Sequence, residues 1–159
     1  MKALRVKLTT SFALVLFAGA ALIFSMTSGA VPIWAFSDQG GNLHVTKECS
    51  QYTGAAGSFC TITASNVGPI KVNSNVYYDQ AAGTPAGLLD SNVVLDAGGG
   101  NRAFGRCSLD LSAGAGLCTF SDGTGQFAGF KARINVTYLG GPNYAWNGTY
   151  SFSSEQERD

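Results

Sequence analysis

Two pairs of cysteines constrain this chain more than any other feature of its sequence. Cys49 and Cys60 are eleven positions apart, and so are Cys107 and Cys118, with small residues in both intervals. An even number of cysteines without CxxC spacing is typical of disulfides formed in an oxidising compartment. A zinc site is the alternative, but His44 is the only histidine. The sequence therefore predicts two disulfides and no metal site.

The spacing also favours one way of pairing the cysteines. Four cysteines allow three connectivities, and the local one joins 49 to 60 and 107 to 118. Alternation along the chain places Cys107 on an apolar face with Leu109, and Cys118 on an apolar face with Phe120. Residues that oppose each other across a hairpin share a face of the sheet, so these two cysteines can meet. Closing a loop of this size contributes roughly 3 kcal/mol in the chain-entropy model.

The first 30 residues have the order of a secretory signal peptide. Three basic residues lie within the first seven positions, residues 8–26 carry no charge, and the small residues Ser28 and Ala30 follow. This order is typical of a cleaved export signal, and we predict a secreted or periplasmic protein. The alternative is an uncleaved membrane anchor, because the uncharged stretch is about as long as the shortest spanning helices, roughly 17 residues.

Loss of residues 1–30 changes the net charge. Three of the ten basic residues and none of the ten acidic residues lie there, so the remainder carries 7 minus 10, or −3. A mildly acidic surface without a basic cluster disfavours nucleic acid as a partner. The sequence contains no cofactor-binding motif in the structural context that such a motif needs, and we expect no cofactor.

The rest of the chain has the pattern of an all-β domain. Glycine accounts for 21 of 159 residues, nearly twice the usual ~7%, and the glycines separate apolar runs as turns do. Alternation predicts strands over 59–65, 70–79, 88–96, 103–111 and 126–138, and a last strand that carries Tyr144, Trp146, Tyr150 and Phe152. We expect an N-terminal segment with the first strand over 31–48, a barrel domain over 49–152 and a polar tail over 153–159. A β-sandwich is the alternative architecture.

Three patterns that could indicate catalysis or nucleotide binding have a simpler interpretation as turns or solvent-facing residues. Gly123, Gly125 and Ala128 match a dinucleotide fingerprint, but that motif needs a following helix, and a strand pattern follows here. His44 lies in a polar segment without a GxSxG motif, so we interpret it as a solvated side chain. Several aspartates are spread over strands and corners, and no spacing selects a carboxylate pair.

Residues 118–152 resemble the allene oxide cyclase barrel-like superfamily, which includes the dirigent proteins. Thr119-Phe120, the glycine corner Asp122-Gly-Thr-Gly-Gln-Phe-Ala-Gly-Phe130 and Trp146-Asn-Gly-Thr-Tyr150 carry the resemblance. It implies a secreted eight-stranded antiparallel barrel, often trimeric, with a pocket for an apolar or phenolic ligand. Together with the cysteines, we predict a single antiparallel eight-stranded β-barrel that is disulfide-bridged.

The chain departs from the family pattern next to the glycine corner. Lys131 stands where dirigent-like members carry an arginine, and Gly129 stands where a bulky aromatic residue is usual. The resemblance points Lys131 and Phe127 into the barrel. Polarity alone instead points Ala128, Phe130 and Ile134 inward, and the sequence leaves the choice open.

Three functional hypotheses follow. The first is a dirigent-like barrel that binds a small apolar or phenolic ligand, with Tyr78, Phe127, Trp146 and Tyr150 as candidate binding residues. The second is a cyclase or isomerase, with Lys131, Arg133 and Asp110 as candidate catalytic residues. The third is an extracellular structural module whose barrel is filled by side chains, because aromatic residues on a strand are also ordinary core residues.

Overall fold

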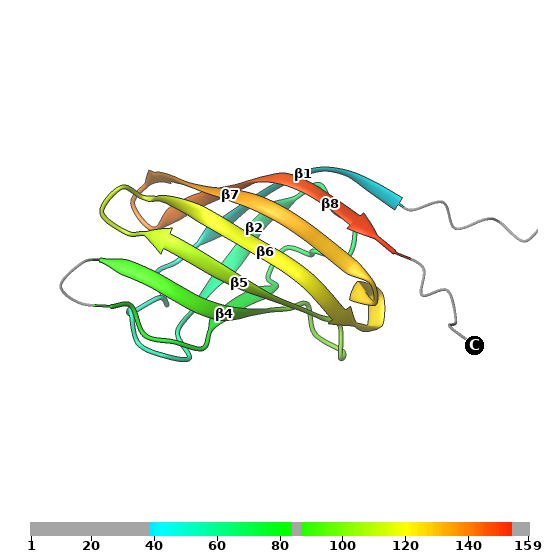
Figure 1. The fold of residues 1–159 in the computed structure, drawn as a ribbon, viewed down its shortest axis with the longest axis horizontal. Coiled ribbons are helices and arrows are strands. Elements are labelled where there is room, and N and C mark those ends of the chain that lie inside the picture. The colour runs from blue at the N-terminus through cyan, green and yellow to red at the C-terminus, as the bar shows by residue number, and fades with distance from the viewer. Residues whose placement is uncertain (1–38, 84–86, 154–159) are drawn as a thin grey trace, which may run out of the picture. The chain divides into compact units, whose positions relative to one another are not determined.

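Eight antiparallel strands close into a barrel in the computed structural model, which describes residues 39–83 and 87–153 (Figure 1). The strands are β1 (Gln39–Glu48), β2 (Phe59–Ser65), β3 (Asn75–Tyr78), β4 (Leu88–Asp96), β5 (Arg102–Asp110), β6 (Ala115–Thr124), β7 (Phe130–Gly140) and β8 (Asn143–Phe152). This confirms the predicted all-β, eight-stranded antiparallel barrel. The predicted signal peptide, residues 31–38 and residues 154–159 lie outside the described residues.

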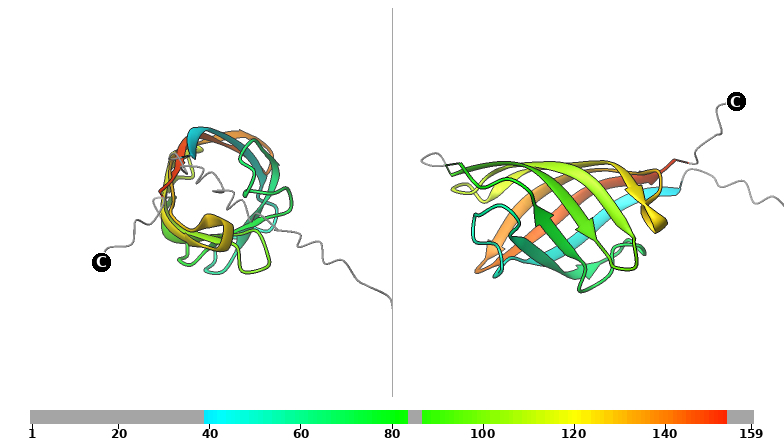
Figure 2. Two further views of the ribbon diagram at one scale, coloured as in Figure 1. Left: turned by 90° about the vertical axis from the view of Figure 1, so that its right-hand side faces the viewer. Right: turned by 90° about the horizontal axis from the view of Figure 1, so that it is seen from below.

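Each strand pairs with the next one along the chain, and β8 pairs with β1 to complete the ring. The closing pair is in register over ten residue pairs, from Gln39 opposite Phe152 to Glu48 opposite Asn143. The view along the barrel shows this ring directly (Figure 2). Because every strand has two neighbours, one face of the whole sheet is enclosed and the other faces solvent.

The enclosed face is the apolar one. On β7, Phe130, Ala132, Ile134 and Val136 are buried, and the residues between them are exposed. Polarity therefore predicted the inward direction of Phe130 and Ile134 correctly, and Lys131 is exposed on the outside. The prediction was wrong for Ala128, which precedes the strand and is exposed. Other large interior side chains include Leu43, Ile62, Val76, Tyr78, Leu89, Val93, Leu95, Phe120 and Trp146.

The strand predictions were correct where alternation is uninterrupted. The structure confirms 59–65 and 88–96 residue for residue. The predicted strand 70–79 is reduced to β3, because residues 67–74 form turns in which Ile70 donates to Val67 and Asn73 has a φ of 71°. Val72 is consequently 55% exposed and does not share the buried face of Val76.

The two disulfides join Cys49 to Cys60 and Cys107 to Cys118, as predicted. Cys107 on β5 lies directly opposite Cys118 on β6 in the strand register, and both are fully buried. Cys49 follows β1, and its bond to Cys60 on β2 closes the segment between these two strands. The two disulfides are consistent with an oxidising, extracellular environment. Within the described part of the chain, no helix is long and apolar enough to cross a membrane.

The glycine corner is a turn between two strands. Residues Gly125–Phe127 form one turn of 3₁₀ helix, and β7 begins directly afterwards, so no α-helix is present to bind a phosphate. Phe127 is buried and packs against Phe130 with 5.4 Å between the ring centroids. Its burial results from this turn, so Phe127 does not share the exposed face of Lys131, as a continuous strand over 126–138 would require. Gly129 completes the corner with a φ of 70°.

We expect the replacement of both Cys107 and Cys118 by alanine to lower the free energy of unfolding by about 2–5 kcal/mol, the usual cost of removing a native disulfide. Chemical denaturation of the purified protein would measure this. Equal stability of the variant and the wild type would show that pairing of β5 with β6 needs no covalent link.

Gly129→Ala should also be destabilising, because a Cβ there would lie 2.1 Å from the carbonyl oxygen of Ser153. A positive φ alone costs a side chain about 1–2 kcal/mol, so the steric conflict should raise the loss above that range. The matched control is Gly98→Ala, since Gly98 has a φ of 79° and its Cβ would meet nothing within 4 Å. Thermal denaturation of both variants would measure the difference, and equal losses would contradict the clash.

Candidate functional site

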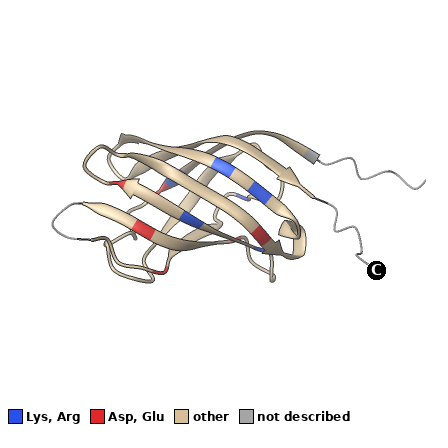
Figure 3. Ribbon diagram, in the orientation of Figure 1, with Lys and Arg blue, Asp and Glu red and all other residues tan. Residues whose placement is uncertain are grey.

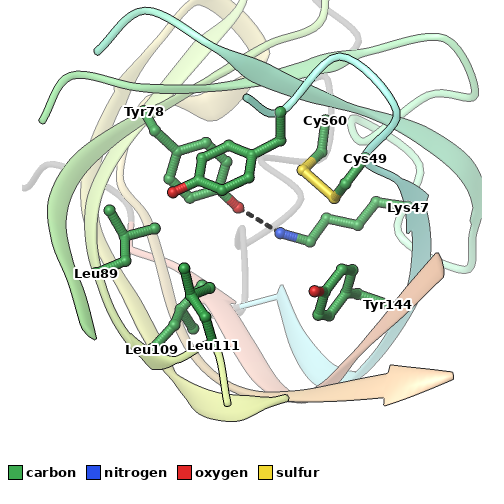
Figure 4. Close-up of a pocket in the computed structure, with 9 residues that line it drawn as sticks. Lys47, Cys49, Cys60, Tyr78, Leu89, Leu109, Leu111 and Tyr144 are labelled. Carbon is green, nitrogen blue, oxygen red and sulfur yellow. Dashed lines mark hydrogen bonds between the residues drawn. A yellow bond between two sulfur atoms is a disulfide. The ribbon is translucent and has the colours of Figure 1, made fainter. Parts of the chain in front are cut away.

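A small pocket lies at the end of the barrel where β1 ends and β8 begins. Its lining is apolar with a few polar groups, and consists of Lys47, Cys49, Tyr52, Cys60, Tyr78, Leu89, Leu109, Leu111 and Tyr144 (Figure 4). The volume open to the centres of water-sized molecules is about 20 Å³, which is room for about one water molecule. Elsewhere in the barrel, large side chains such as Phe130, Ile134 and Leu95 are fully buried in the interior.

Lys47 is the unusual residue of this pocket. Along β1, Leu43, Val45 and Lys47 occupy successive inward positions, and the lysine side chain is only 1% exposed. β1 is paired on both sides, with β2 and β8, so the strand cannot rotate to present this side chain to solvent. β2 carries a bulge opposite Thr46 and Lys47, a local irregularity that is common at barrel rims.

The ammonium group of Lys47 lies among aromatic side chains. Its Nζ atom donates a hydrogen bond to the hydroxyl oxygen of Tyr78, and Figure 4 shows the lysine reaching across the pocket to make it. The same atom lies 4.7 Å from the ring centroid of Trp146, 5.1 Å from that of Tyr78 and 5.7 Å from that of Tyr144. These distances are in the range of cation–π interactions.

Burial nevertheless dominates the charge state of this lysine. Removal from water lowers the pKa of Lys47 from 10.5 to about 7. Among the described residues, the ion pairs are Arg102 with Asp96 and Arg106 with Asp90, so no carboxylate is paired with Lys47. Near neutral pH the pocket therefore contains both the neutral amine and the ammonium form.

The tyrosines around Lys47 stay protonated. Burial raises the pKa of Tyr78 well above its ordinary value, with smaller contributions from Tyr52 and Tyr144. Tyr52 packs edge-on against Tyr78, with 5.1 Å between ring centroids, and burial raises its pKa as well. The Tyr52 hydroxyl is buried and has no hydrogen-bond partner among the described residues. A buried hydroxyl that donates no hydrogen bond lowers the stability of the folded state.

The structure brings two of the four predicted binding residues to this site. Tyr78 lines the pocket, and Trp146 packs beside the Lys47 ammonium. Tyr150 instead contacts Phe130 and Phe152, nearer the other end of β8. Phe127 lies at the glycine corner, also at that other end. These two aromatic residues contribute to packing away from the pocket.

The predicted catalytic residues lie elsewhere. Lys131 and Arg133 are exposed on the outside of β7, where they line an open depression in the barrel wall. Asp110 ends β5 and accepts hydrogen bonds from the backbone and hydroxyl of Ser112, which lower its pKa. The barrel wall separates Lys131 and Arg133 from the pocket. His44 is exposed, with its Nδ1 atom 2.9 Å from the Asn147 side-chain oxygen.

Charged residues on the outside are spread over several strands on the face drawn in Figure 3. Among the described residues, two pairs form across β4 and β5: Arg102 contacts Asp96, and Arg106 makes two hydrogen bonds to Asp90. This bidentate contact raises the pKa of Arg106 and lowers that of Asp90. Both side chains are more than half exposed, so such a pair adds little to stability.

Sequence reasoning missed Lys47 and Tyr52. The signal for Lys47 was present, because Leu43, Val45 and Lys47 alternate with polar residues directly before Cys49. A lysine that continues an apolar period-two face is a candidate buried cation. Tyr52 had no such signal, since it lies in the irregular segment between β1 and β2.

Comparison of the chain with protein-family models, with curated proteins and with solved structures found no significant match. The resemblance to the allene oxide cyclase and dirigent barrels therefore stays a prediction, as does the trimer that it implies. We therefore infer the function from the geometry and chemistry of the pocket.

Replacement of Lys47 by methionine should stabilise the protein most at low pH. The pKa of this lysine falls from 10.5 to about 7 on folding, so the unfolded chain binds more protons between these pH values and wild-type stability rises with pH there. Through the titration of Lys47, the free energy of unfolding of the wild type should rise by roughly 2–3 kcal/mol between pH 6 and pH 9. The raised pKa of Tyr78 affects stability only above pH 10.0, the ordinary pKa of this side chain.

Urea denaturation of the wild type and of Lys47→Met at pH 6 and pH 9 would measure this. The advantage of the methionine variant should be large at pH 6 and smaller at pH 9. Lys131→Met, on the exposed face of β7, is the matched control and should leave the pH dependence as in the wild type. A constant difference between Lys47→Met and the wild type would contradict the burial of a titrating amine.

Proposed function

We propose that this protein is an exported barrel that binds a small apolar or phenolic ligand in the pocket beside Lys47. The single observation that carries the proposal is the combination of an apolar wall with hydrogen-bonding groups that converge on it. Leu89, Leu109 and Leu111 form the wall. Ligand sites are characteristically apolar concave surfaces with a few placed polar groups.

The polar groups suit the oxygen of a phenol. The Lys47 ammonium is a cation without a carboxylate partner among the described residues, and it would attract a phenolate or a phenol oxygen. The unpartnered Tyr52 hydroxyl would gain a hydrogen bond from the same oxygen. The ring of the ligand would then lie against the leucines, out of water.

The size of the cavity sets a condition on this function. A volume of about 20 Å³ for water-sized molecules is far smaller than a phenol needs. Tyr52 covers Tyr78 and belongs to the segment between β1 and β2 rather than to a strand. Displacement of the Tyr52 ring is therefore the movement that would admit a ligand.

The filled interior favours a second candidate, an extracellular structural module that binds nothing. Large side chains such as Trp146, Phe130 and Leu95 are fully buried along the barrel, as expected of a packed eight-stranded barrel. The cyclase or isomerase alternative stays untested. Lys131 and Arg133 lie on the outer face of the barrel, and Asp110, although it stands between Leu109 and Leu111, is not among the residues that line the pocket. Export itself is part of the proposal and is supported by the two disulfides.

Titration calorimetry with 4-methylphenol and with 1-octanol would test the binding function. We expect one molecule of 4-methylphenol to bind per chain. Tyr52→Ala opens the pocket but removes the hydroxyl that contacts the phenol oxygen, so it should strengthen the binding of octanol more than that of 4-methylphenol. Lys47→Met should weaken the binding of 4-methylphenol by about tenfold, because one hydrogen bond to a charged group is lost. It should leave the binding of octanol nearly unchanged. Lys131→Met is the control on the outer face.

Two outcomes would contradict the proposal. If neither the wild type nor Tyr52→Ala binds either compound, the structural module is the better description. If binding is lost in Lys131→Met and retained in Lys47→Met, the ligand occupies the outer depression and the pocket is not the site.

A further inference from the structure

We propose that Lys47 is a carbonyl-reactive amine that forms an imine with a small apolar aldehyde in the pocket. This inference goes beyond reversible ligand binding, and it requires the pocket but not the binding of a phenol. It stands on the position of one nitrogen atom, on what surrounds it and on the chemistry of the cavity wall.

The Nζ atom of Lys47 is placed as a nucleophile requires. It borders the cavity, and its one side-chain hydrogen bond is to the hydroxyl of Tyr78. None of the residues that line the pocket is acidic, so no carboxylate holds the lysine in its charged form. Burial brings the pKa of Lys47 to about 7, so about half of the amine carries a free lone pair at neutral pH. Desolvation in an apolar pocket is a known way of activating a lysine for imine formation.

The reaction balances without an oxidant or reductant. The lone pair of neutral Nζ forms a bond to the carbonyl carbon, and the carbonyl oxygen takes up the two protons of the amine and leaves as water, which creates the C=N bond. Tyr78 is within hydrogen-bonding distance of Nζ, and its raised pKa keeps it protonated. In the proposed step it gives its proton to the departing oxygen while it takes one from nitrogen, so it serves as the catalytic proton relay.

The product also suits the site. The neutral imine becomes a cation when its nitrogen takes up one proton from the solvent. The rings of Trp146, Tyr78 and Tyr144 that surround Nζ would stabilise this cation as they stabilise the ammonium. Exclusion of water would slow its hydrolysis, because Lys47 is 1% exposed.

The lining selects the class of aldehyde. Leu89, Leu109 and Leu111 face the cavity, and Lys47 is the only charged residue among those that line it. Once Nζ is part of the imine, no second cation remains to hold a carboxylate or a phosphate. The volume of about 20 Å³ limits an unassisted reactant to a very small molecule. The lining therefore suits a short uncharged aldehyde such as acetaldehyde, which would enter as the Tyr52 ring is displaced, and it does not suit a keto acid or a sugar phosphate.

Reductive trapping on the folded wild-type protein would test the proposal. The protein is incubated with acetaldehyde and sodium cyanoborohydride, whose hydride reduces the imine to a stable secondary amine, and peptide mass mapping follows modification at each lysine. At pH 7 we expect Lys47 to be modified about tenfold faster than the exposed lysines Lys71 and Lys131, because an ordinary lysine is almost entirely protonated at this pH. Its rate should rise between pH 6 and pH 8 and then level off.

Two variants refine the test. Tyr78→Phe keeps the amine and should slow trapping at Lys47 without abolishing it. Lys47→Met should remove the fast site and leave Lys71 and Lys131 unchanged. If Lys47 reacts no faster than Lys71 in the wild type, or reacts only after unfolding in urea, the proposal is overturned, and this comparison does not depend on whether any variant folds.

The outcome is separable from that of the binding function. Binding of 4-methylphenol without trapping at Lys47 would overturn the imine alone. Trapping at Lys47 without binding of 4-methylphenol would overturn the phenolic ligand and leave the reactive amine in place.

Discussion

Closure of the sheet between β1 and β8 is the constraint on which the rest of this structure depends. The ten residue pairs that join these strands remove both edges of the sheet and enclose one of its faces. An eight-stranded barrel has an interior just wide enough to be filled by side chains. Most inward positions along the strands are therefore occupied by apolar residues, and a polar side chain on this face, such as Lys47 or Ser91, has no route to solvent through the wall.

Lys47 shows what that constraint costs. Three aromatic rings and the hydroxyl of Tyr78 surround its ammonium group, and both kinds of contact favour the charged form. The pKa is nevertheless lowered to about 7, so the loss of hydration outweighs these contacts. Residues whose pKa is strongly shifted by burial are common at functional sites. Both proposals for the pocket therefore centre on Lys47.

Much of the fold follows from local pattern, and the candidate site follows from it only in part. The disulfides and the strands 59–65 and 88–96 could be predicted because spacing and alternation are local properties. Tyr138 could not be placed in the same way: it continues the apolar alternation of β7, yet it is 48% exposed because the strand runs on beyond the buried part of the barrel. Tyr78 and Trp146 were predicted as binding residues, but nothing in the sequence showed that Lys47 would join them.

The sequence by itself determined the all-β class, the stapled hairpins and the two faces of each strand, because a strand has a side-chain period of two whatever surrounds it. Only the tertiary structure decided which face is enclosed and at what depth each residue lies. Resemblance and polarity disagreed about Lys131, and barrel closure placed it outside. The same closure placed Lys47 inside, because its strand is held in register on both sides and the direction of its side chain follows from that register.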